Sequence, residues 1–339
     1  MVYHSVSIIV VTYNGEKYLR KCFYSIAGQD YPKEKLQIIV VDNDSKDASI
    51  DYIKKTYKDA LAVNSGGNLG YSGGGNFGYK YAKGDYVALM ANDMIFPKDW
   101  IKKMVAFMEK NKGAAVGTCG MVNGEDASVT DGEVLNASPI LVGRADTKNT
   151  GYTVVPWGGA CMFRRKLFDE PFDADYFLYG EDTYLGLTAW LRGFKVMTAP
   201  IKVAHLGSVT IGFLSKTQVH YNERNRLINK MVFFKLGTSF LLIPLVVGDL
   251  AIKLAYFLKI KRPDLVKTEL DAVWWNFRNF GKNMRKRRAV QAQRKVPDHV
   301  ILDVLCENLY GDGRLKSKLN YFAGGYFRLI KRVYRKFGI

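Results

Sequence analysis

Residues 6–15 read VSIIVVTYNG, an apolar run that ends in polar residues and a glycine. Five of the first six residues are Val or Ile, and an uninterrupted β-branched run is typical of a strand that is buried on both faces. Such strands occur in parallel sheets that are covered by helices on each side. The sequence therefore predicts an α/β fold that begins with this strand.

Helical and strand patterns alternate after this run. Within residues 15–27, apolar side chains recur at helical spacing, at Leu19, Cys22, Phe23 and Ile26. Further apolar runs predict strands at 36–41, 60–64 and 86–90. Between and after them we expect helices that run from Ser45 towards residue 57, over 76–82 and over 97–110. This order predicts a doubly wound, mostly parallel sheet, in which ligands bind at the carboxyl ends of the strands.

Polar side chains follow three of these strands. The first ends in Thr12-Tyr13-Asn14, the second in Asp42 and the fourth in Asn92-Asp93. An isolated Asp after a strand is most often a turn former or a helix cap, but carboxylates at one edge of one sheet also suit ligand binding. Asp42 would accept a hydrogen bond from the N–H of a pyrimidine ring. Asp93 would bind a hard divalent cation such as Mg²⁺ or Mn²⁺.

Residues 65–78, SGGNLGYSGGGNFG, contain seven glycines among fourteen residues. Two interpretations stay open: a flexible loop, or a loop whose backbone approaches a ligand or adopts positive φ. Asn68 and Asn76 frame the glycines, and the helix expected after them would favour an anion at its N-terminus, which supports the second interpretation. A dinucleotide-binding fold would place its glycines directly after the first strand. Because that turn contains only Gly15, a dehydrogenase is disfavoured.

Seven sequence elements occur in a diagnostic order and spacing. They are VSIIVVTYN (6–14), IIVVDNDS (38–45), NLGYSGGGNFG (68–78), ND (92–93), WGGA (157–160), FDADYFLYGED (172–182) and HLGS (205–208). Together they resemble glycosyltransferase family 2, in its rhamnosyltransferase-like branch, over residues 5–230. The resemblance implies a GT-A fold, a nucleotide-diphosphate sugar donor, a divalent cation (Mg²⁺ or Mn²⁺) and inversion at the anomeric carbon.

The resemblance also implies roles for individual residues. Those that would bind the donor are Thr12, Tyr13, Asn14, Asp42, Asn68, Gly70, Asn92, Trp157 and Gly159, with Arg224 as a secondary contact to the diphosphate. Asp93 and His205 would hold the cation, although a single His is more often a structural hydrogen-bond partner. The family's first acidic metal-binding position is Ala91 here.

The same resemblance makes Glu181-Asp182 the catalytic acidic pair. Asp182 would deprotonate the acceptor hydroxyl and Glu181 would orient it, although both acids also suit the first turn of a helix. Nearby aromatic residues would either form a wall for a sugar ring or belong to the core: Trp157, Tyr176, Phe177 and Tyr179. Tyr184 and Thr188 depart from the family pattern, so the preferred sugar or acceptor would differ from that of a typical rhamnosyltransferase.

The positive charge of the chain is concentrated in its C-terminal part. The net charge is +18, and residues 201–339 hold 27 basic and 9 acidic side chains, whereas residues 1–200 hold 23 of each. Residues 321–337 interleave aromatic and basic side chains at helical spacing, which is typical of a helix among lipid headgroups. The chain has no nucleic-acid-binding motif. We therefore expect an anionic membrane surface as a partner, and no nucleic acid.

Residues 240–248, FLLIPLVVG, are apolar, but Asp249 and Lys253 follow closely. A membrane-spanning helix needs about 20 mostly apolar residues, so this segment predicts an interfacial or hairpin-like helix better than a spanning one. A helix that is buried against the catalytic domain is the alternative. Whether residues 236–258 enter the bilayer stays open.

These features predict two domains, a GT-A catalytic domain over residues 1–225 and a helical basic and aromatic region over 226–339. Because the four cysteines are scattered and no secretory signal is visible, we expect the cytoplasmic face of the membrane, in a peripheral or interfacial position. The expected activity is inverting transfer from a dTDP-rhamnose, UDP-sugar or GDP-mannose class donor to a lipid-linked glycan or glycolipid in cell-surface glycan assembly. The alternatives are an inactive membrane-bound scaffold with the same fold, for which Ala91 argues, and a Mg²⁺-dependent nucleotidyltransferase.

Overall fold

The computed structural model describes residues 3–123, 151–206, 214–305 and 314–338, except for the side chains of residues 314–320. The chain divides into two compact units. The first unit comprises Met1–Leu135, Pro156–Leu185 and Lys195–Gly212. The second unit comprises Asn136–Val155, Gly186–Phe194 and Phe213–Ile339.

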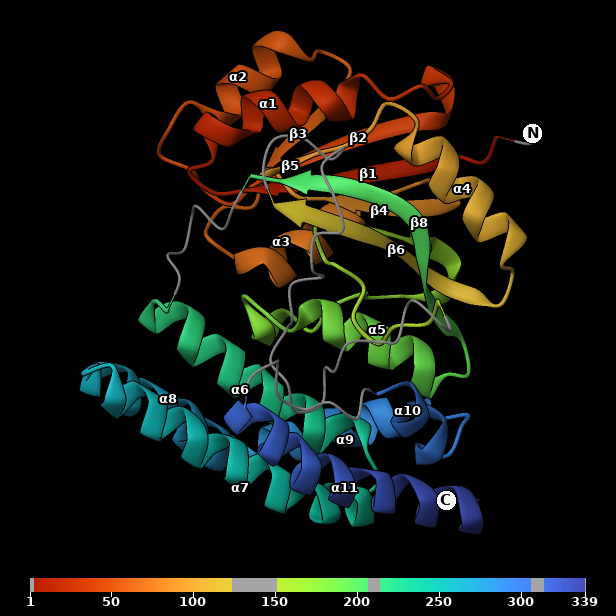
Figure 1. Cartoon of the computed structure of the whole chain (residues 1–339). Coiled ribbons are helices and arrows are strands. Elements are labelled where there is room, and N and C mark those ends of the chain that lie inside the picture. Colours follow the sequence, from red (N-terminus) through yellow and green to blue (C-terminus); the bar gives the residue numbers. More distant parts are fainter. Residues whose placement is uncertain (1–2, 124–150, 207–213, 306–313, 339) are drawn as a thin grey trace. The chain divides into compact units, whose positions relative to one another are not determined.

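The first unit is built on one sheet (Figure 1). In spatial order its strands are β3 (Leu61–Asn64), β2 (Leu36–Asp42), β1 (Val6–Thr12), β4 (Tyr86–Met90), β7 (Ala160–Arg164), β6 (Ala114–Asn123), β8 (Lys195–His205) and β5 (Met94–Ile95). β1 pairs in parallel with β2 and β4, β2 with β3, and β6 with β8, whereas β7 and β5 pair antiparallel with their neighbours. The strand order reverses at β1, and ligands bind such sheets at the carboxyl ends of the strands beside a reversal.

The predicted α/β fold with a mostly parallel sheet is confirmed. The helices of this unit are α1 (Glu16–Ala27), α2 (Ser49–Thr56), α3 (Gly70–Tyr79) and α4 (Trp100–Lys110). β1 is buried along its whole length, and α1 buries the four apolar residues that define its predicted face. Burial on both sides explains why β1 consists almost entirely of Val and Ile.

The glycine-rich segment forms a helix, which corrects the flexible-loop interpretation. α3 begins at Gly70, well before the predicted start at residue 76. A Cβ added to Gly78 would lie 2.8 Å from the side chains of Ile9 and Val41, and one added to Gly74 would lie 2.7 Å from Val11. The missing side chains therefore let α3 lie directly against β1 and β2, and this packing outweighs the low helix propensity of glycine.

The second unit is helical among the residues that the structure describes. Its helices are α6 (Lys216–Phe233), α7 (Leu236–Lys259), α8 (Pro263–Arg278), α9 (Phe280–Gln291), α10 (Asp298–Val304) and α11 (Arg314–Phe337). A further helix, α5 (Glu181–Leu191), begins in the first unit and ends in the second. The predicted boundary at 225/226 falls inside α6, and the described residues 151–155, 186–194 and 214–225 of the predicted catalytic domain belong to the second unit.

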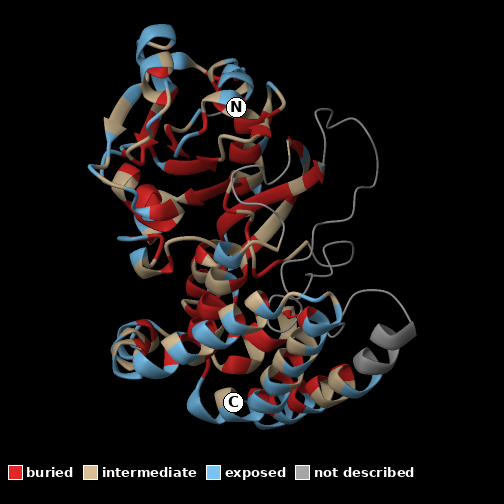
Figure 2. Cartoon of the chain, turned by 90° about the vertical axis from the view of Figure 1, so that its left-hand side faces the viewer, coloured by how far each residue is buried: buried red, intermediate tan, exposed pale blue. Residues whose placement is uncertain are grey.

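The apolar segment at residues 240–248 is part of a longer helix than its sequence alone indicates. α7 extends over 24 residues, and by length and composition it is the described helix that could cross a bilayer. Only 22% of its most apolar stretch is buried within the protein. In Figure 2 the helices of this unit carry both buried and exposed residues.

Candidate active site

Two strand ends meet where the strand order reverses. Thr12 ends β1 and Asn92 follows β4, and the Nδ2 of Asn92 donates to Thr12 Oγ1 at 3.1 Å. A Cβ added to Gly15 would lie 2.4 Å from the Asn92 amide, so this turn requires a glycine. The backbone N–H of Asn14 donates to Ser45 Oγ at 2.9 Å, which ties the loop after β1 to the loop after β2. Three residues predicted to bind the donor therefore lie at one edge of the sheet.

Asp42 ends β2 directly opposite Thr12 and is 1% exposed. Its Oδ1 accepts from the Ser45 N–H at 3.1 Å, and its Oδ2 accepts from Asn64 Nδ2 at 3.1 Å. Each carboxylate oxygen has a second lone pair, so these bonds leave capacity for a further donor. Tyr13, the next residue after Thr12, is 39% exposed.

The N-terminus of α3 holds the loop that leads to α5. Asn68 Oδ1 accepts from the Gly70 N–H at 2.9 Å. Gly70 has a φ of +67°, and a Cβ there would lie 2.2 Å from the main-chain oxygen of Phe177. That oxygen accepts from the Ser72 N–H at 3.2 Å. Glycine at position 70 is thus required for docking this loop on α3. This requirement does not depend on whether Gly70 contacts a donor.

Asp93 and His205 lie side by side because β5 pairs with β8. Met94 is opposite His205 in this ladder, and His205 Nε2 lies 3.3 Å from Asp93 Oδ2. His205 Nδ1 is buried and has no hydrogen-bond partner. A carboxylate and an imidazole are suitable ligands for Mn²⁺ or Mg²⁺. Within the described ranges no three His, Cys, Asp or Glu side chains are grouped to hold a metal, so a cation here would need ligands from substrate and water.

Glu181 and Asp182 form the first turn of α5. Glu181 is 8% exposed, and its Oε2 has no hydrogen-bond partner. Asp182 accepts from the backbone N–H of Thr183 at 2.6 Å and from that of Gly158. Burial raises the pKa of both carboxyls above their usual range, and the charge of Asp182 raises the pKa of Glu181 further. Because hydrogen bonds stabilise the ionised Asp182, Asp182 loses its proton first.

Tyr71 belongs to this site although the sequence analysis does not single it out. Its hydroxyl donates to the carbonyl oxygen of Gly158 at 2.7 Å. Burial raises the pKa of Tyr71 well above its usual value, and the charges of Glu181, Asp93 and Asp182 act in the same direction. The sequence feature that could have identified Tyr71 is its position directly after Gly70 in the glycine-rich segment.

These contacts bring the predicted acids to one edge of the sheet. Asp42 is opposite Thr12, Thr12 is bonded to Asn92, and Asn92 precedes Asp93. The charges of Asp93 and Asp182 both raise the pKa of Tyr71. Carboxylates that are grouped at one edge of a sheet suit cation-assisted phosphate chemistry.

The loop between η3 (Ala174–Tyr176) and α5 has a strained backbone. Phe177 and Tyr179 have φ of 61° and 63°, in the left-handed region, and Gly180 follows with 81°. Such conformations cost about 1–3 kcal/mol for a non-glycine residue and cluster at functional sites. The strain lies directly before the acidic pair.

For one of the four aromatic residues, the structure favours the core over the sugar-stacking wall. Tyr176 is fully buried and packs edge to face against Tyr184, with ring centroids 5.5 Å apart, so it is a core residue. Trp157 is half-buried against the core. Gly159 contacts Ala91 so closely that an added Cβ would lie 2.5 Å from the Ala91 Cβ.

Arg224 lies on α6 in the second unit. Its guanidinium is 4.5 Å from the ring centroid of Tyr221 and 4.7 Å from that of Trp275. Its Nε donates to Asn225 Oδ1 at 2.9 Å, and the residue is 6% exposed. These contacts give Arg224 a structural role in the helical unit, and its contact with a diphosphate stays a prediction.

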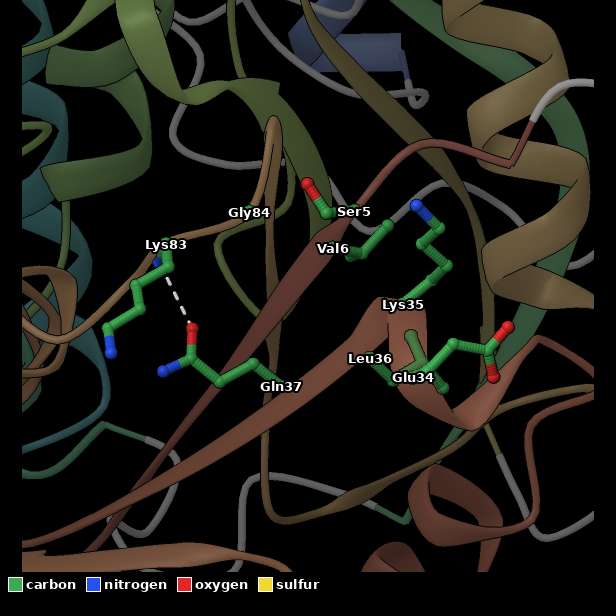
Figure 3. Close-up of a pocket in the computed structure, with 8 residues that line it drawn as sticks. All are labelled: Ser5, Val6, Glu34, Lys35, Leu36, Gln37, Lys83 and Gly84. Carbon is green, nitrogen blue, oxygen red and sulfur yellow. Dashed lines mark hydrogen bonds between the residues drawn. The ribbon is translucent and has the colours of Figure 1, made fainter.

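A shallow pocket lies at the opposite edge of the sheet, beside the amino-terminal ends of β1 and β2 (Figure 3). Ser5, Gln37 and Lys83 are among the residues that line it, and the Lys83 N–H donates to Gln37 Oε1 at 3.0 Å. None of the predicted site residues lines this pocket. Its position away from the strand carboxyl ends does not suit a substrate site in this type of sheet.

Relatives of known activity match the chain in sequence. The Methanococcus voltae dolichyl N-acetyl-α-D-glucosaminyl phosphate 3-β-D-2,3-diacetamido-2,3-dideoxy-β-D-glucuronosyltransferase is 27% identical over 269 residues, which cover 73% of this chain and 83% of that protein. The Staphylococcus aureus poly(ribitol-phosphate) β-N-acetylglucosaminyltransferase TarS is 33% identical over 109 residues. That match covers 31% of this chain and only 19% of TarS.

Solved structures share the fold over almost the whole chain. S. aureus TarS 1–349 in complex with UDP aligns with a TM-score of 0.56 at 18% identity, covering 98% of this chain and 91% of that one. The Pyrobaculum calidifontis mannosyltransferase PcManGT in complex with GDP-Man and Mn²⁺ aligns with a TM-score of 0.54 at 17% identity, covering 98% and 87%. Both comparisons support the GT-A fold.

The model of glycosyl transferase family 2 matches residues 7–172. This range contains the sheet edge with Thr12, Asp42 and Asp93, and it ends shortly before the acidic pair. The rhamnosyltransferase-like branch stays a prediction, because the match does not specify it. The chain thus shares the GT-A fold and is similar to glycosyl transferase family 2 over residues 7–172.

Proposed function

We propose that the protein transfers a sugar, with inversion, from a nucleotide-diphosphate sugar to a hydroxyl group of a lipid-linked glycan or glycolipid. The observation that carries this proposal is the acidic pair in the first turn of α5, where Glu181 is buried and Asp182 is half-buried, beside Tyr71. The name of the M. voltae relative describes a dolichyl-linked acceptor. TarS and PcManGT were solved with UDP-GlcNAc and GDP-Man respectively, which supports a donor of the nucleotide-sugar class.

Asp182 is the proposed base. The acceptor oxygen forms a bond to the anomeric carbon while the bond from that carbon to the diphosphate oxygen breaks, and the diphosphate leaves with the electron pair. The hydroxyl proton passes to Asp182, whose raised pKa makes it a stronger base than an ordinary Asp. Glu181 keeps its proton to higher pH, so it is suited to donate a hydrogen bond rather than to act as base.

Asp93 and His205 would hold a divalent cation. Their facing Oδ2 and Nε2 atoms suit a hard or borderline metal ion. When bound, such an ion neutralises charge on the leaving diphosphate. Thr12, Tyr13, Asn14, Asp42, Asn68, Gly70 and Asn92 are proposed to line the donor site, with Trp157 and Gly159 nearby and Arg224 as a secondary contact.

A ligand-binding panel tests this proposal. We expect one member of a set of UDP-, dTDP- and GDP-sugars to raise the melting temperature, and Mn²⁺ to increase the shift, because stabilisation grows with ligand concentration relative to Kd. In Asp93→Ala the Mn²⁺-dependent part of the shift should be lost. Stabilisation by a donor without any transfer to lipid-linked acceptors would favour the inactive scaffold, and the absence of any shift would refute the donor site.

The proposed place of action is the cytoplasmic face of the membrane. The basic excess of residues 201–339 supports an anionic lipid surface as partner, and a lipid-linked acceptor would be available there. The binding panel identifies the nucleotide base of the donor, and analysis of the product identifies the linkage. Both results bear on the branch of the family.

A further inference from the structure

The outer side of α7 is an uncharged apolar stripe. Exposed apolar residues recur every three or four positions, as Leu236, Phe240, Ile243, Val247, Ala251, Ala255 and Leu258. Several are highly exposed, with Phe240 at 66% and Leu258 at 61%. A contiguous exposed apolar surface of this length is unusual on a soluble protein and marks an interaction site.

Asp249 and Lys253 of α7 point the other way, whereas Lys259 is exposed at the end of the helix. Asp249 is 2% exposed and lies 2.7 Å from Arg226 of α6. Lys253 lies 2.7 Å from Glu223 of α6 and 3.4 Å from Glu269 of α8. These ion pairs bind the inner side of α7 to its neighbours in the helical unit. To span a bilayer, α7 would have to break this cluster or carry it into the hydrocarbon, and both are costly.

A second apolar stripe adjoins the first, on α11. Its exposed members are Phe322, Leu329, Val333 and Phe337, again at helical spacing. The two helices are in contact (Figure 1), since Tyr326 Oη donates to the Leu241 carbonyl oxygen at 3.0 Å and Thr238 Oγ1 bonds to Tyr334 Oη at 2.9 Å. The exposed apolar residues of α7 and α11 together are called the α7–α11 face.

Basic residues border this face. Arg332 and Lys336 are exposed on α11, one residue before Val333 and Phe337 of the stripe. At the two ends of α7, Lys235 and Lys259 are also exposed. Apolar side chains between cationic ones match the chemistry of an anionic bilayer surface, where acyl chains lie beneath negative headgroups. A second copy of this chain, whose net charge is +18, would offer no such negative border.

We propose that the α7–α11 face docks on anionic lipid, with both helices lying in the plane of the headgroups and α7 not crossing the bilayer. This placement keeps the ion-pair cluster inside the helical unit and buries both stripes in the membrane interface. The biological meaning of the docking rests on the proposed function. Vesicle binding is measured without donor or acceptor, however, so either proposal can fail alone.

The test is sedimentation of the purified full-length protein with phosphatidylcholine vesicles that contain or lack phosphatidylglycerol. Phe240→Glu/Val247→Glu places acids on the stripe, and Tyr24→Glu/Leu61→Glu is its control at exposed apolar positions of the first unit. Arg332→Glu/Lys336→Glu reverses two bordering charges, and Lys54→Glu/Lys55→Glu is its control on α2, where both lysines are exposed. Circular dichroism checks that each variant is folded.

We expect the wild type and both controls to bind phosphatidylglycerol vesicles alike. The apolar-face variant should bind about tenfold more weakly or worse, and the charge-reversal variant roughly 30-fold more weakly. Binding should fall at high salt, and alkaline carbonate should release the bound protein. Equal binding by variants and controls would refute the docking face. Resistance to carbonate would show that α7 enters the bilayer. A dimer that Phe240→Glu/Val247→Glu dissociates, without any vesicle binding by the wild type, would assign the face to a second copy of the chain.

Discussion

Isosteric amide replacements distinguish the roles of the two buried acids. Asp182→Asn removes the proposed base but keeps the shape of the side chain and its capacity to accept the Thr183 N–H at 2.6 Å. Glu181→Gln mimics the protonated carboxyl that the structure favours at this position, because burial and the neighbouring charge raise its pKa. The two changes are therefore similar in size but should differ in their consequences for turnover.

The expected magnitudes follow from the burial of both side chains. Loss of a general base lowers kcat by about 100- to 10,000-fold, and this is the range expected for Asp182→Asn. Glu181→Gln should retain most of the turnover. A carboxyl whose pKa is raised by folding loses stability as the pH rises from its unfolded pKa, about 4.3, through its folded pKa. Above that pH range, each unit by which folding raises the pKa lowers the free energy of unfolding by about 1.4 kcal/mol. Glu181→Gln should therefore stabilise the protein at alkaline pH and not at acid pH.

Transfer rates and melting temperatures measured over a pH series check these expectations. In the wild type, kcat should rise with pH along a limb that lies above the ordinary pKa of Asp, because burial raises the pKa of Asp182. Glu181→Gln should keep that limb, and Asp182→Asn should abolish it. If Asp182→Asn retained the limb and Glu181→Gln lost it, the roles would be reversed. If both variants turned over normally, neither acid would be the base.

Four further predictions concern residues outside the acidic pair. Gly70→Ala should lower stability by at least about 1 kcal/mol, since its positive φ alone costs that much and its Cβ would meet backbone at 2.2 Å; Gly67→Ala, with open space around it, is the control in thermal melts. Tyr71→Phe should cost about 1 kcal/mol for its lost hydrogen bond and should lower kcat more than it changes the donor KM; an unchanged kcat would argue against its place in the site. Lys253→Met should destabilise the protein by about 3–5 kcal/mol, because it removes a cation that pairs with three buried acids. Although burial opposes ionisation, the neighbouring cations hold the pKa of Glu223 at about 2, so its contribution to stability should disappear as the pH falls from about 4.3 to 2, as acid titration of unfolding will reveal.

Local patterns accounted for the elements of the sheet that lie next to each other in the chain. Runs of Val and Ile and the helical spacing around Phe23 are properties of short segments, and a buried strand or an amphipathic helix cannot form without them. The polar residues at the strand ends are also visible in short segments, and a parallel sheet brings them to one edge. Local patterns do not predict the start of α3, because glycine has low helix propensity. No short segment shows that α3 packs so closely against β1 and β2 that larger side chains are excluded.

Long-range contacts settled the rest. The pairing of β5 with β8 sets His205 beside Asp93, and the hydroxyl of Tyr71 reaches the loop that faces Asp182. Likewise, the sequence alone shows Lys253 as a charge that disfavours a membrane-spanning α7. In the folded unit Lys253 points inward to buried acids, and the outer stripe of the helix is therefore apolar. A residue type and its spacing carry the chemistry of a site, but the distance between groups on separate elements depends on how the whole chain packs, which no short window of residues contains.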